Sequence, residues 1–332
     1  APQQWEQEAA ITLPGLTVSS ANAIDLAEAG DSVTIFTHSL SGALPEGATV
    51  NNFRVDLAAE NEITSLKAST TGKVATAELQ TAIEKAYGKR PTERSFNATV
   101  YANIIVNGQA SLIKGETTVK AIPVAPQISQ HYYLIGAPSA WDPTCVTMPF
   151  NHSNKDVYED PVFSIVFPVA DGETWFAVTD DITVEKNDLS QVFGCAEGNG
   201  NNGEEGTLKR RADLTDDGSF KVVVNGDAKF IKMTLNMMEY TYKIEKLNFA
   251  EFIYVPGNHQ GWSPEKAPAL QSPNFDGVYV GYTYLNGNFK FTKERNWNAE
   301  YNFNDFAVKD DIFFNNDGSN INISEEGFYQ IK

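Results

Sequence analysis

An internal repeat occupies the last two thirds of the chain. The run Tyr133-Leu-Ile-Gly136 precedes Trp141-Asp-Pro143 by four residues, and the same arrangement returns at Tyr254-Val-Pro-Gly257 and Trp262-Ser-Pro264. The offset is 121 residues throughout. A repeat of this length is one structural unit made twice, so it predicts two consecutive domains of the same fold.

Alternating apolar residues predict that the repeated unit is built of strands. In each copy the alternation runs into Asp-Gly or Asn-Gly and resumes beyond it. This pattern predicts a β-hairpin in each copy and, for the whole unit, a small β-sandwich. The residues are Phe163, Ile165, Phe167, Asp171-Gly172 and Trp175-Phe176 in the first copy and Tyr282, Tyr284, Asn286-Gly287, Phe289 and Phe291 in the second.

A further correspondence aligns the ends of the two copies. It sets Leu214, Gly218 and Phe220 against Ile323, Gly327 and Tyr329. By this alignment the second copy is shorter by one or two strands. We therefore expect either that the natural protein continues beyond Lys332 or that its last domain lacks a strand. The first copy also holds a Gly/Asn-rich insertion, which its composition predicts to be a flexible surface loop at Gly198–Gly206.

The first third of the chain also consists mainly of predicted strands. Six residues alternate between Phe96 and Val106, and Asn107-Gly108 then supplies a type I′ turn. One short helix is expected, capped by Thr76 and ended by Gly88. This pattern predicts an immunoglobulin-like sandwich. The fold class is therefore all-β, with an immunoglobulin-like domain at 1–126 and two carbohydrate-binding-module-like sandwiches at 127–247 and 248–332.

Charge and motif content exclude several classes of protein. The chain has 43 acidic and 25 basic residues and a net charge of −18, which disfavours nucleic acid as a partner. Its four histidines lack metal-ligand spacing, and no nucleophile or phosphate-binding motif occurs, so the sequence predicts no enzyme activity, metal or cofactor. Cys145 and Cys195 could form a disulfide or remain free thiols.

Aromatic residues are concentrated in the repeated part of the chain. Residues 1–126 hold six of them, whereas residues 248–332 hold 18. A sugar presents flat C–H faces edged by hydroxyls, so a site for it needs exposed rings with polar side chains nearby. The segment from Phe289 to Asn302 supplies both. We expect Phe289 and Phe291 to face the core, while Lys293, Arg295 and Trp297 lie on a polar loop.

The tryptophans of the repeated part can be interpreted in two ways. Trp297 is either a binding ring or a lid over the edge of the sandwich. Trp262 and Trp141 occupy the repeated Gly/Pro-rich turn, where each is either a binding platform or a plug of the hydrophobic core, with the plug slightly favoured. Trp175 neighbours Phe176 on a strand, so one of the two must face outward.

These motifs resemble those of the SusE/SusF-type starch-binding outer-membrane lipoproteins of Bacteroidetes. The resemblance rests on Tyr254–Trp262, Asn274–Gly277, Phe289–Thr292 with Trp297, and, in the first third, Ala77–Leu79 and Thr118–Pro123. It covers essentially the whole chain. The resemblance implies maltooligosaccharide binding by aromatic platforms with Lys or Arg donors, for which the candidate residues are Trp297, Lys293, Arg295, Trp262, Tyr301, Trp141 and Trp175.

The resemblance also implies a cellular role. Such a protein would be held on the cell surface at the outer membrane by a lipidated N-terminal segment, which is absent from this chain. It would retain starch-type α-glucan or a related oligosaccharide for an outer-membrane uptake system without catalysis. The alternative is an interaction or assembly module of that uptake complex, in which the aromatic loops contact a protein partner and no sugar.

Overall fold

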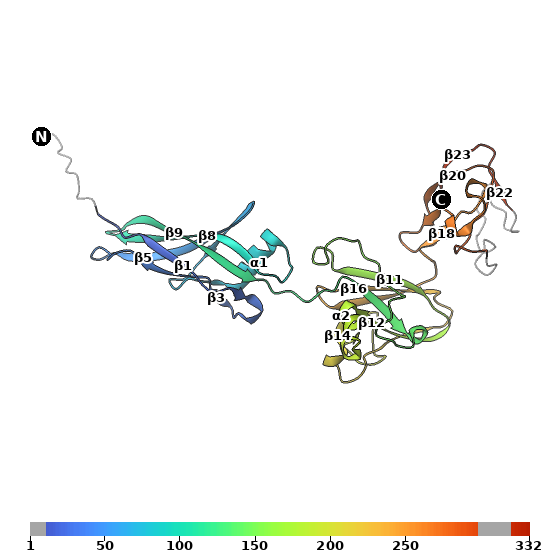
Figure 1. The fold of residues 1–332 in the computed structure, drawn as a ribbon, viewed down its shortest axis with the longest axis horizontal. Coiled ribbons are helices and arrows are strands. Elements are labelled where there is room, and N and C mark those ends of the chain that lie inside the picture. Colours follow the sequence, from blue (N-terminus) through green and yellow to red (C-terminus); the bar gives the residue numbers. More distant parts are fainter. Residues whose placement is uncertain (1–10, 298–319) are drawn as a thin grey trace. The chain divides into compact units, whose positions relative to one another are not determined.

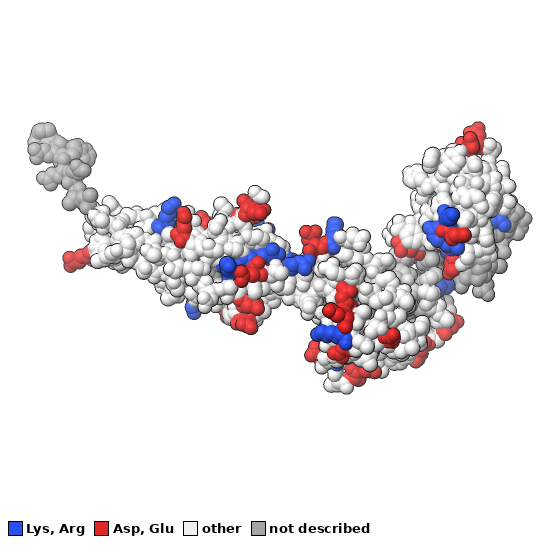
Figure 2. All heavy atoms as spheres, in the orientation of Figure 1, with Lys and Arg blue, Asp and Glu red and all other residues white. Residues whose placement is uncertain are grey.

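The computed structural model describes residues 11–297 and 320–332. The chain forms two compact units. One comprises residues up to Ser129 with the segments 153–161 and 237–239, and the other comprises the remainder. Within the described residues, no helix has the length and apolar character needed to cross a membrane. Figure 2 shows acidic and basic side chains interspersed over the visible face, without a continuous basic patch there.

The N-terminal domain is a sandwich built around one long sheet (Figure 1). The order in this five-stranded sheet is β2-β9-β8-β5-β6, and β1-β4 and β3-β7 form two further pairs. The elements are β1 (Leu16–Ser20), β2 (Ile24–Asp25), β3 (Ser32–Thr34), β4 (Phe36–Leu40), β5 (Thr49–Ala59), β6 (Glu62–Lys67), β7 (Lys73–Ala75), α1 (Thr76–Tyr87), β8 (Arg94–Val106) and β9 (Gln109–Ile122).

The alternation predicted for β8 is confirmed. Every second residue from Phe96 to Ile104 is buried, and the intervening ones are not. The strand turns into β9 through Asn107 and Gly108, whose φ angles are 50° and 78°. Both values are positive, as a two-residue type I′ turn requires. These strands therefore build the sandwich core as the pattern indicates.

The helix α1 forms where predicted, but its cap differs. Leu79 and Ile83 are fully buried, and Gly88 ends the helix at φ 79°. Thr76 is not the cap, because Ala75 occupies that position without a side-chain hydrogen bond. The Thr76 hydroxyl instead donates to the carbonyl of Gly30, 46 residues earlier. The hydroxyl of Thr76 therefore makes a tertiary hydrogen bond instead of capping the helix.

The middle sandwich is one eight-stranded sheet folded upon itself. Its strand order is β10-β12-β13-β14-β17-β16-β11, with β15 paired to β12 outside this path. The elements are β10 (Tyr132–Gly136), η2 (Ala137–Ser139), β11 (Val162–Pro168), β12 (Gly172–Asp180), α2 (Asp181–Lys186), η3 (Leu189–Gln191), β13 (Phe193–Cys195), β14 (Glu205–Arg210), η4 (Arg211–Asp213), β15 (Phe220–Val224), β16 (Phe230–Asn236) and β17 (Thr241–Leu247).

The C-terminal domain repeats part of this arrangement in its described residues. Antiparallel pairs form between β18 and β19, β20 and β23, and β21 and β22. The elements are β18 (Phe252–Tyr254), η5 (Asn258–Gln260), η6 (Pro264–Lys266), β19 (Ala269–Gln271), β20 (Gly281–Leu285), β21 (Asn288–Phe289), β22 (Ile321–Asn322) and β23 (Gly327–Ile331).

The repeated turn is the same structure in both copies. Trp141 and Trp262 have φ angles of 59° and 58°, and their N–H groups donate to Gly136 and Gly257 at 3.1 Å and 3.0 Å. Both glycines lie against a neighbouring strand: a Cβ at Gly136 would lie 2.8 Å from the carbonyl oxygen of Trp175, and one at Gly257 would lie 2.6 Å from that of Asn288. The repeat is therefore one of backbone geometry as well as sequence.

The predicted hairpins are wrong in both copies. The strand β11 pairs with β16, whereas β12 pairs with β10, β13 and β15. In the second copy β20 pairs with β23 and β21 with β22. Gly172 and Gly287 do have positive φ angles, of 108° and 93°. The two strands that flank each of these turns, however, pair with other strands and not with each other. Alternation cannot separate the two outcomes, because a strand buries one face in either.

Two alignments within the repeat are also corrected. On β20 the buried residues are Thr283 and Leu285, so Tyr282 and Tyr284 face outward rather than matching the inward phenylalanines of β11. Phe220 pairs with Phe176 as Ile321 pairs with Phe289. Ile321 is therefore the counterpart of Phe220, and β23, which carries Tyr329, corresponds to β16. The correspondence of Phe220 with Tyr329 is wrong.

The Gly/Asn-rich loop is tied to β15 rather than free. The side chain of Asn202 accepts from the N–H of Lys221 at 2.7 Å and donates to its carbonyl at 3.1 Å. Asn199 accepts from the N–H of Ser219 at 3.0 Å. These amides take the place of a neighbouring strand, which composition alone does not indicate. Cys145 and Cys195 are free thiols, the first half-buried and the second buried.

Candidate functional site

Two tryptophans meet on the surface of the C-terminal domain. Trp262 lies between η5 and η6, and Trp297 lies on the loop that follows β21. Their ring centroids are 6.2 Å apart and their planes are inclined by 34°. Trp297 is 44% exposed and Trp262 is half-buried, so the pair presents ring surface to solvent. A core plug would be buried, and Trp262 is not.

The orientation of Trp262 is fixed by its own turn. Its backbone has positive φ, and the indole Nε1–H donates to the side-chain oxygen of Asn258 at 2.8 Å. Asn258 begins η5, directly after Gly257. Positive φ is uncommon for a residue with a bulky side chain, so the turn holds this ring at a conformational cost. The hydrogen bond satisfies the polar edge of the indole and leaves its apolar surface available.

The loop that carries Trp297 is anchored at its start and in its middle. Thr292 is buried and exchanges backbone hydrogen bonds with Tyr254 at 2.8 Å and 2.9 Å. The guanidinium of Arg295 donates to the carbonyls of Glu265 and Ala267 at 3.0 Å and 2.8 Å, and it lies 4.4 Å from the ring centroid of Tyr254. Arg295 therefore braces the loop.

The remaining predictions for this segment have mixed outcomes. Phe289 and Phe291 are buried, as the alternation predicts. Lys293 is half-buried on the same loop as Trp297, beyond the last paired residue. Tyr301 lies outside the described residues. The structure thus brings Trp262, Trp297 and the Arg295 brace together in one place.

Trp175 occupies a different surface, on β12 of the middle sandwich. Phe176 is buried and Trp175 is half-buried, so the outward residue of the two is the tryptophan. Its indole N–H donates to Glu173 at 3.1 Å, and the Lys221 ammonium lies 5.2 Å from its ring centroid. A Cβ at Gly200 would lie 2.6 Å from this ring, so the Gly/Asn-rich loop covers part of it.

Trp141 differs from Trp262 although both occupy the repeated turn. Trp141 packs with Cys145 against three buried residues, Ile135, Ala177 and Val192. It is half-buried, and the ring serves as partial cover for this small apolar cluster. The same backbone turn thus presents one tryptophan to a second aromatic ring and sets the other against the core.

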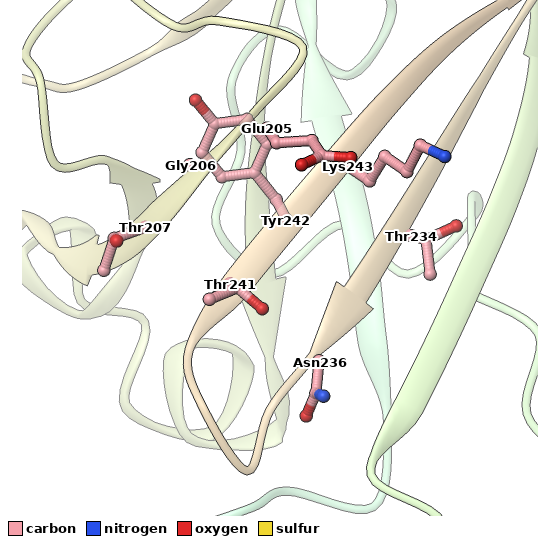
Figure 3. Close-up of a pocket in the computed structure, with 8 residues that line it drawn as sticks. All are labelled: Glu205, Gly206, Thr207, Thr234, Asn236, Thr241, Tyr242 and Lys243. Carbon is pink, nitrogen blue, oxygen red and sulfur yellow. The ribbon is translucent and has the colours of Figure 1, made fainter.

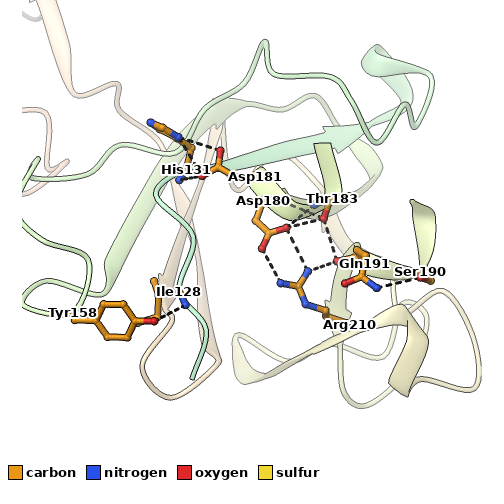
Figure 4. Close-up of polar contacts among 9 residues, drawn as sticks. All are labelled: Ile128, His131, Tyr158, Asp180, Asp181, Thr183, Ser190, Gln191 and Arg210. Carbon is orange, nitrogen blue, oxygen red and sulfur yellow. Dashed lines mark hydrogen bonds and ion pairs between the residues drawn. The ribbon is translucent and has the colours of Figure 1, made fainter. Parts of the chain in front are cut away.

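A buried ion pair holds the segment that corresponds to the Trp297 loop. Thr179 pairs with Tyr133 as Thr292 pairs with Tyr254, so α2 follows the same point of the fold. Arg210 donates to the fully buried Asp180 at 2.8 Å and to the carbonyl of Gln191 at 2.7 Å (Figure 4).

The hydrogen bonds to Asp180 determine its ionisation. Burial raises the pKa of this carboxyl group, but hydrogen bonds from Arg210 and Thr183 outweigh that effect and leave the pKa below its ordinary value. Asp180 also caps α2 by accepting from the N–H of Thr183 at 3.0 Å. The group is therefore a structural anion of the middle sandwich.

An open hollow of about 500 Å³ lies on the sheet formed by β14, β17 and β16 (Figure 3). Burial, followed by the influence of Glu197 and Cys195, raises the pKa of Tyr242 to about 12, so its hydroxyl is neutral at physiological pH. The residues that line the hollow are Glu205, Gly206, Thr207, Thr234, Asn236, Thr241, Tyr242 and Lys243.

In the described residues no cluster of three His, Cys, Asp or Glu side chains could hold a metal ion.

The strand arrangement defines a multidomain all-β protein in which an immunoglobulin-like domain precedes sandwiches of the carbohydrate-binding-module type, as the sequence predicts. Residues 1–123 match the family model for the N-terminal domain of the outer membrane protein SusF, and residues 127–246 match the model for the first starch-specific carbohydrate-binding module of SusF. The chain belongs to the SusF family, and the SusE/SusF resemblance is confirmed.

The crystal structure of SusF from Bacteroides thetaiotaomicron is 19% identical to this chain, and the match covers 96% of this chain and 73% of that one with a TM-score of 0.32. No curated protein matched the chain.

Proposed function

We propose that this protein is a non-catalytic carbohydrate-binding protein that holds starch-type α-glucan through the exposed Trp262–Trp297 pair. The observation that carries the proposal is the geometry of this pair: two indoles with centroids 6.2 Å apart, on two loops that are each braced by hydrogen bonds. Rings held in advance lose little freedom on binding, so more of the stacking free energy contributes to affinity.

The chemistry of the pair suits a neutral sugar. Aromatic faces cover the apolar C–H surface of a pyranose, and the adjoining loop supplies Lys293 as a donor to its hydroxyl rim. An acidic protein of net charge −18 would repel an anionic polymer and has no such penalty for an uncharged one. Binding alone accounts for this arrangement, which needs no nucleophile or general base.

The middle sandwich contributes a second contact region in this proposal. Its family model is described as starch-specific, and its outward tryptophan is Trp175, beside Lys221. Trp141 adds less, because the small apolar cluster occupies part of its ring. Two weak sites on one chain would raise retention of a long polymer through effective concentration.

The proposed location is the cell surface at the outer membrane. The family model for the first domain carries the name of an outer membrane protein. We propose lipid anchoring through an N-terminal segment that precedes this chain, and retention of glucan close to outer-membrane uptake proteins.

Isothermal titration with maltoheptaose tests the proposal. We expect weak binding to the full chain and a loss of about fivefold or more in affinity for Trp297→Ala, since one stacked ring contributes about 1 kcal/mol. Lys293→Ala should weaken binding less. Phe249→Ala, which removes an exposed ring of the same domain, is the matched control and should leave affinity unchanged.

Three results would contradict the proposal. Absence of heat at millimolar maltoheptaose, together with passage of the protein through an amylopectin affinity gel, would remove the starch assignment. Unchanged retention of Trp297→Ala on that gel would remove the site and favour the interaction or assembly module. Release of reducing ends from starch would show that the protein is an enzyme.

A further inference from the structure

A second group of aromatic rings lies on the outer face of β20 and β23. Tyr282 is 73% exposed, Tyr284 is 36% exposed and Phe328 is 83% exposed. Tyr284 and Phe328 are directly opposite each other in the antiparallel pair, with ring centroids 5.4 Å apart. Large exposed aromatic side chains gathered on one face are unusual for a protein surface and indicate a contact site.

The fold itself does not require aromatic residues here. The core side of these strands is formed by Leu285, Tyr329 and Ile331, which pack against the buried cluster of the domain. In the middle sandwich, the corresponding pair β11 and β16 has Ser164 opposite Thr234 on its outer face. That face also carries two valines and the half-buried Phe230, but it has no cluster of strongly exposed rings like the one at 282, 284 and 328, so the strand pairing itself does not require such a cluster.

The aromatic face adjoins the turn that supports the tryptophan pair. A Cβ at Gly287, two residues beyond the end of β20, would lie 2.8 Å from the amide nitrogen of Asn258. Asn258 in turn accepts the hydrogen bond from the indole of Trp262. The turn after β20 therefore contacts Asn258, which supports Trp262. The same turn directly follows the strand that carries Tyr282 and Tyr284.

The groups around these rings favour a sugar as the occupant. Gln330 lies opposite Tyr282, and a hydrogen bond between Glu326 and the hydroxyl of Tyr284 raises the pKa of that tyrosine and keeps it neutral. The face thus combines apolar rings with the amide of Gln330, the hydroxyl of Tyr284 and the carboxylate of Glu326. C–H faces with a rim of hydroxyls are complementary to this combination.

We propose that the Tyr282–Tyr284–Phe328 face is an additional contact surface for long or particulate α-glucan, which extends beyond the tryptophan pair. This inference rests on the proposed function, because it names the polymeric form of the ligand. A short oligosaccharide fills the tryptophan site alone. A chain on a granule surface contacts both places at once, and its dissociation is slowed accordingly.

The test compares a short and a polymeric ligand on the full chain. In the double variant Tyr282→Ala/Phe328→Ala, affinity for maltoheptaose should stay within about twofold, because the tryptophan pair is intact. Retention on granular starch should fall about tenfold, since each ring contributes a few-fold to affinity. The matched control is Ser164→Ala/Thr234→Ala, on the corresponding face of the middle sandwich, which should change neither value.

Each other outcome overturns the inference in a recognisable way. Unchanged retention on granules by the double variant, with weakened maltoheptaose binding by Trp297→Ala, would reject the extended surface and keep the proposed function. An equal loss for both ligands would reject a separate surface, and circular dichroism would show whether folding is affected. Concentration-dependent self-association that the double variant abolishes, with granule retention unchanged, would assign the face to a second copy of the chain.

Discussion

The two copies of the repeat share one turn and use it differently. After Gly257 the turn directs Trp262 toward Trp297, whereas after Gly136 it sets Trp141 against Cys145 and a buried cluster. The φ angles of the two tryptophans differ by one degree. What differs is the segment that follows the neighbouring strand, a loop braced by Arg295 in one copy and the helix α2 in the other. The backbone supplies the position of a ring, and the neighbouring segment decides its use.

The largest effect should come from breaking the buried ion pair. Arg210→Ala leaves Asp180 buried without its charged partner, which we expect to cost about 3–5 kcal/mol of unfolding free energy. The corresponding brace in the other copy is exposed, so Arg295→Ala should cost about 1 kcal/mol. Urea unfolding of both variants measures the difference. Equal losses would mean that the two segments are held with similar strength.

The glycines that begin the repeated turn should be the next most sensitive. Gly257→Ala and Gly136→Ala place a methyl group 2.6 Å and 2.8 Å from a backbone carbonyl oxygen, and we expect each to cost about 1–3 kcal/mol. Gly226→Ala has open space around the added carbon but positive φ, and it separates crowding from backbone strain. Thermal unfolding that left Gly257→Ala unchanged would refute the close approach.

The acid response should distinguish the middle sandwich from the rest. The pKa of Asp180 is lower in the folded state than in the unfolded chain, so its ion pair contributes full stability above the unfolded value of about 3.9. That contribution is lost as pH falls through the lower, folded value. Urea unfolding at pH 7 and at pH 3 should show a smaller decline for Asp180→Asn than for the natural sequence. Equal declines would assign the acid sensitivity to other carboxylates.

The smallest effect should concern the orientation of Trp262. Asn258→Ala removes the acceptor of the indole N–H, and we expect a loss in maltoheptaose affinity of about fivefold or less with little change in stability. Asn258→Asp retains an acceptor oxygen and should restore most of the affinity. Titration calorimetry of the two variants separates orientation from packing, because a merely structural role would affect both alike.

Sequence patterns correctly predicted which face of most strands is buried, but they did not predict which strands pair with each other. Alternation around Phe96 and Phe289 correctly predicted which side chains are buried, since burial of one face depends only on local period. It failed for the partner of β12, because a crossover and a hairpin bury the same face. It also failed at Tyr282, where outward aromatic residues imitate an inward pattern.

The candidate site was predictable in its residue types but not in its geometry. Trp262 and Trp297 are 35 positions apart, and their contact depends on a turn and a loop with no common periodicity. Arg295 was predicted as a sugar donor, and the local sequence gives no sign that its Nη1 donates to two backbone carbonyls about 30 residues away. Side chains that bond to distant backbone groups leave no local pattern, and Asn202 is a second example.

The bonding of that asparagine has a consequence for how the protein ages. Asn202 is followed by Gly203, a context in which the side-chain amide is readily hydrolysed to a carboxylate. An aspartate there would keep an oxygen for the N–H of Lys221 but would turn a second oxygen, instead of an N–H donor, toward its carbonyl. The loop would keep its bonds from Asn199 and Gly200 to Ser219 but would be held less firmly over the ring of Trp175. One slow chemical change would thus alter the proposed contact region at Trp175 without any change in the gene.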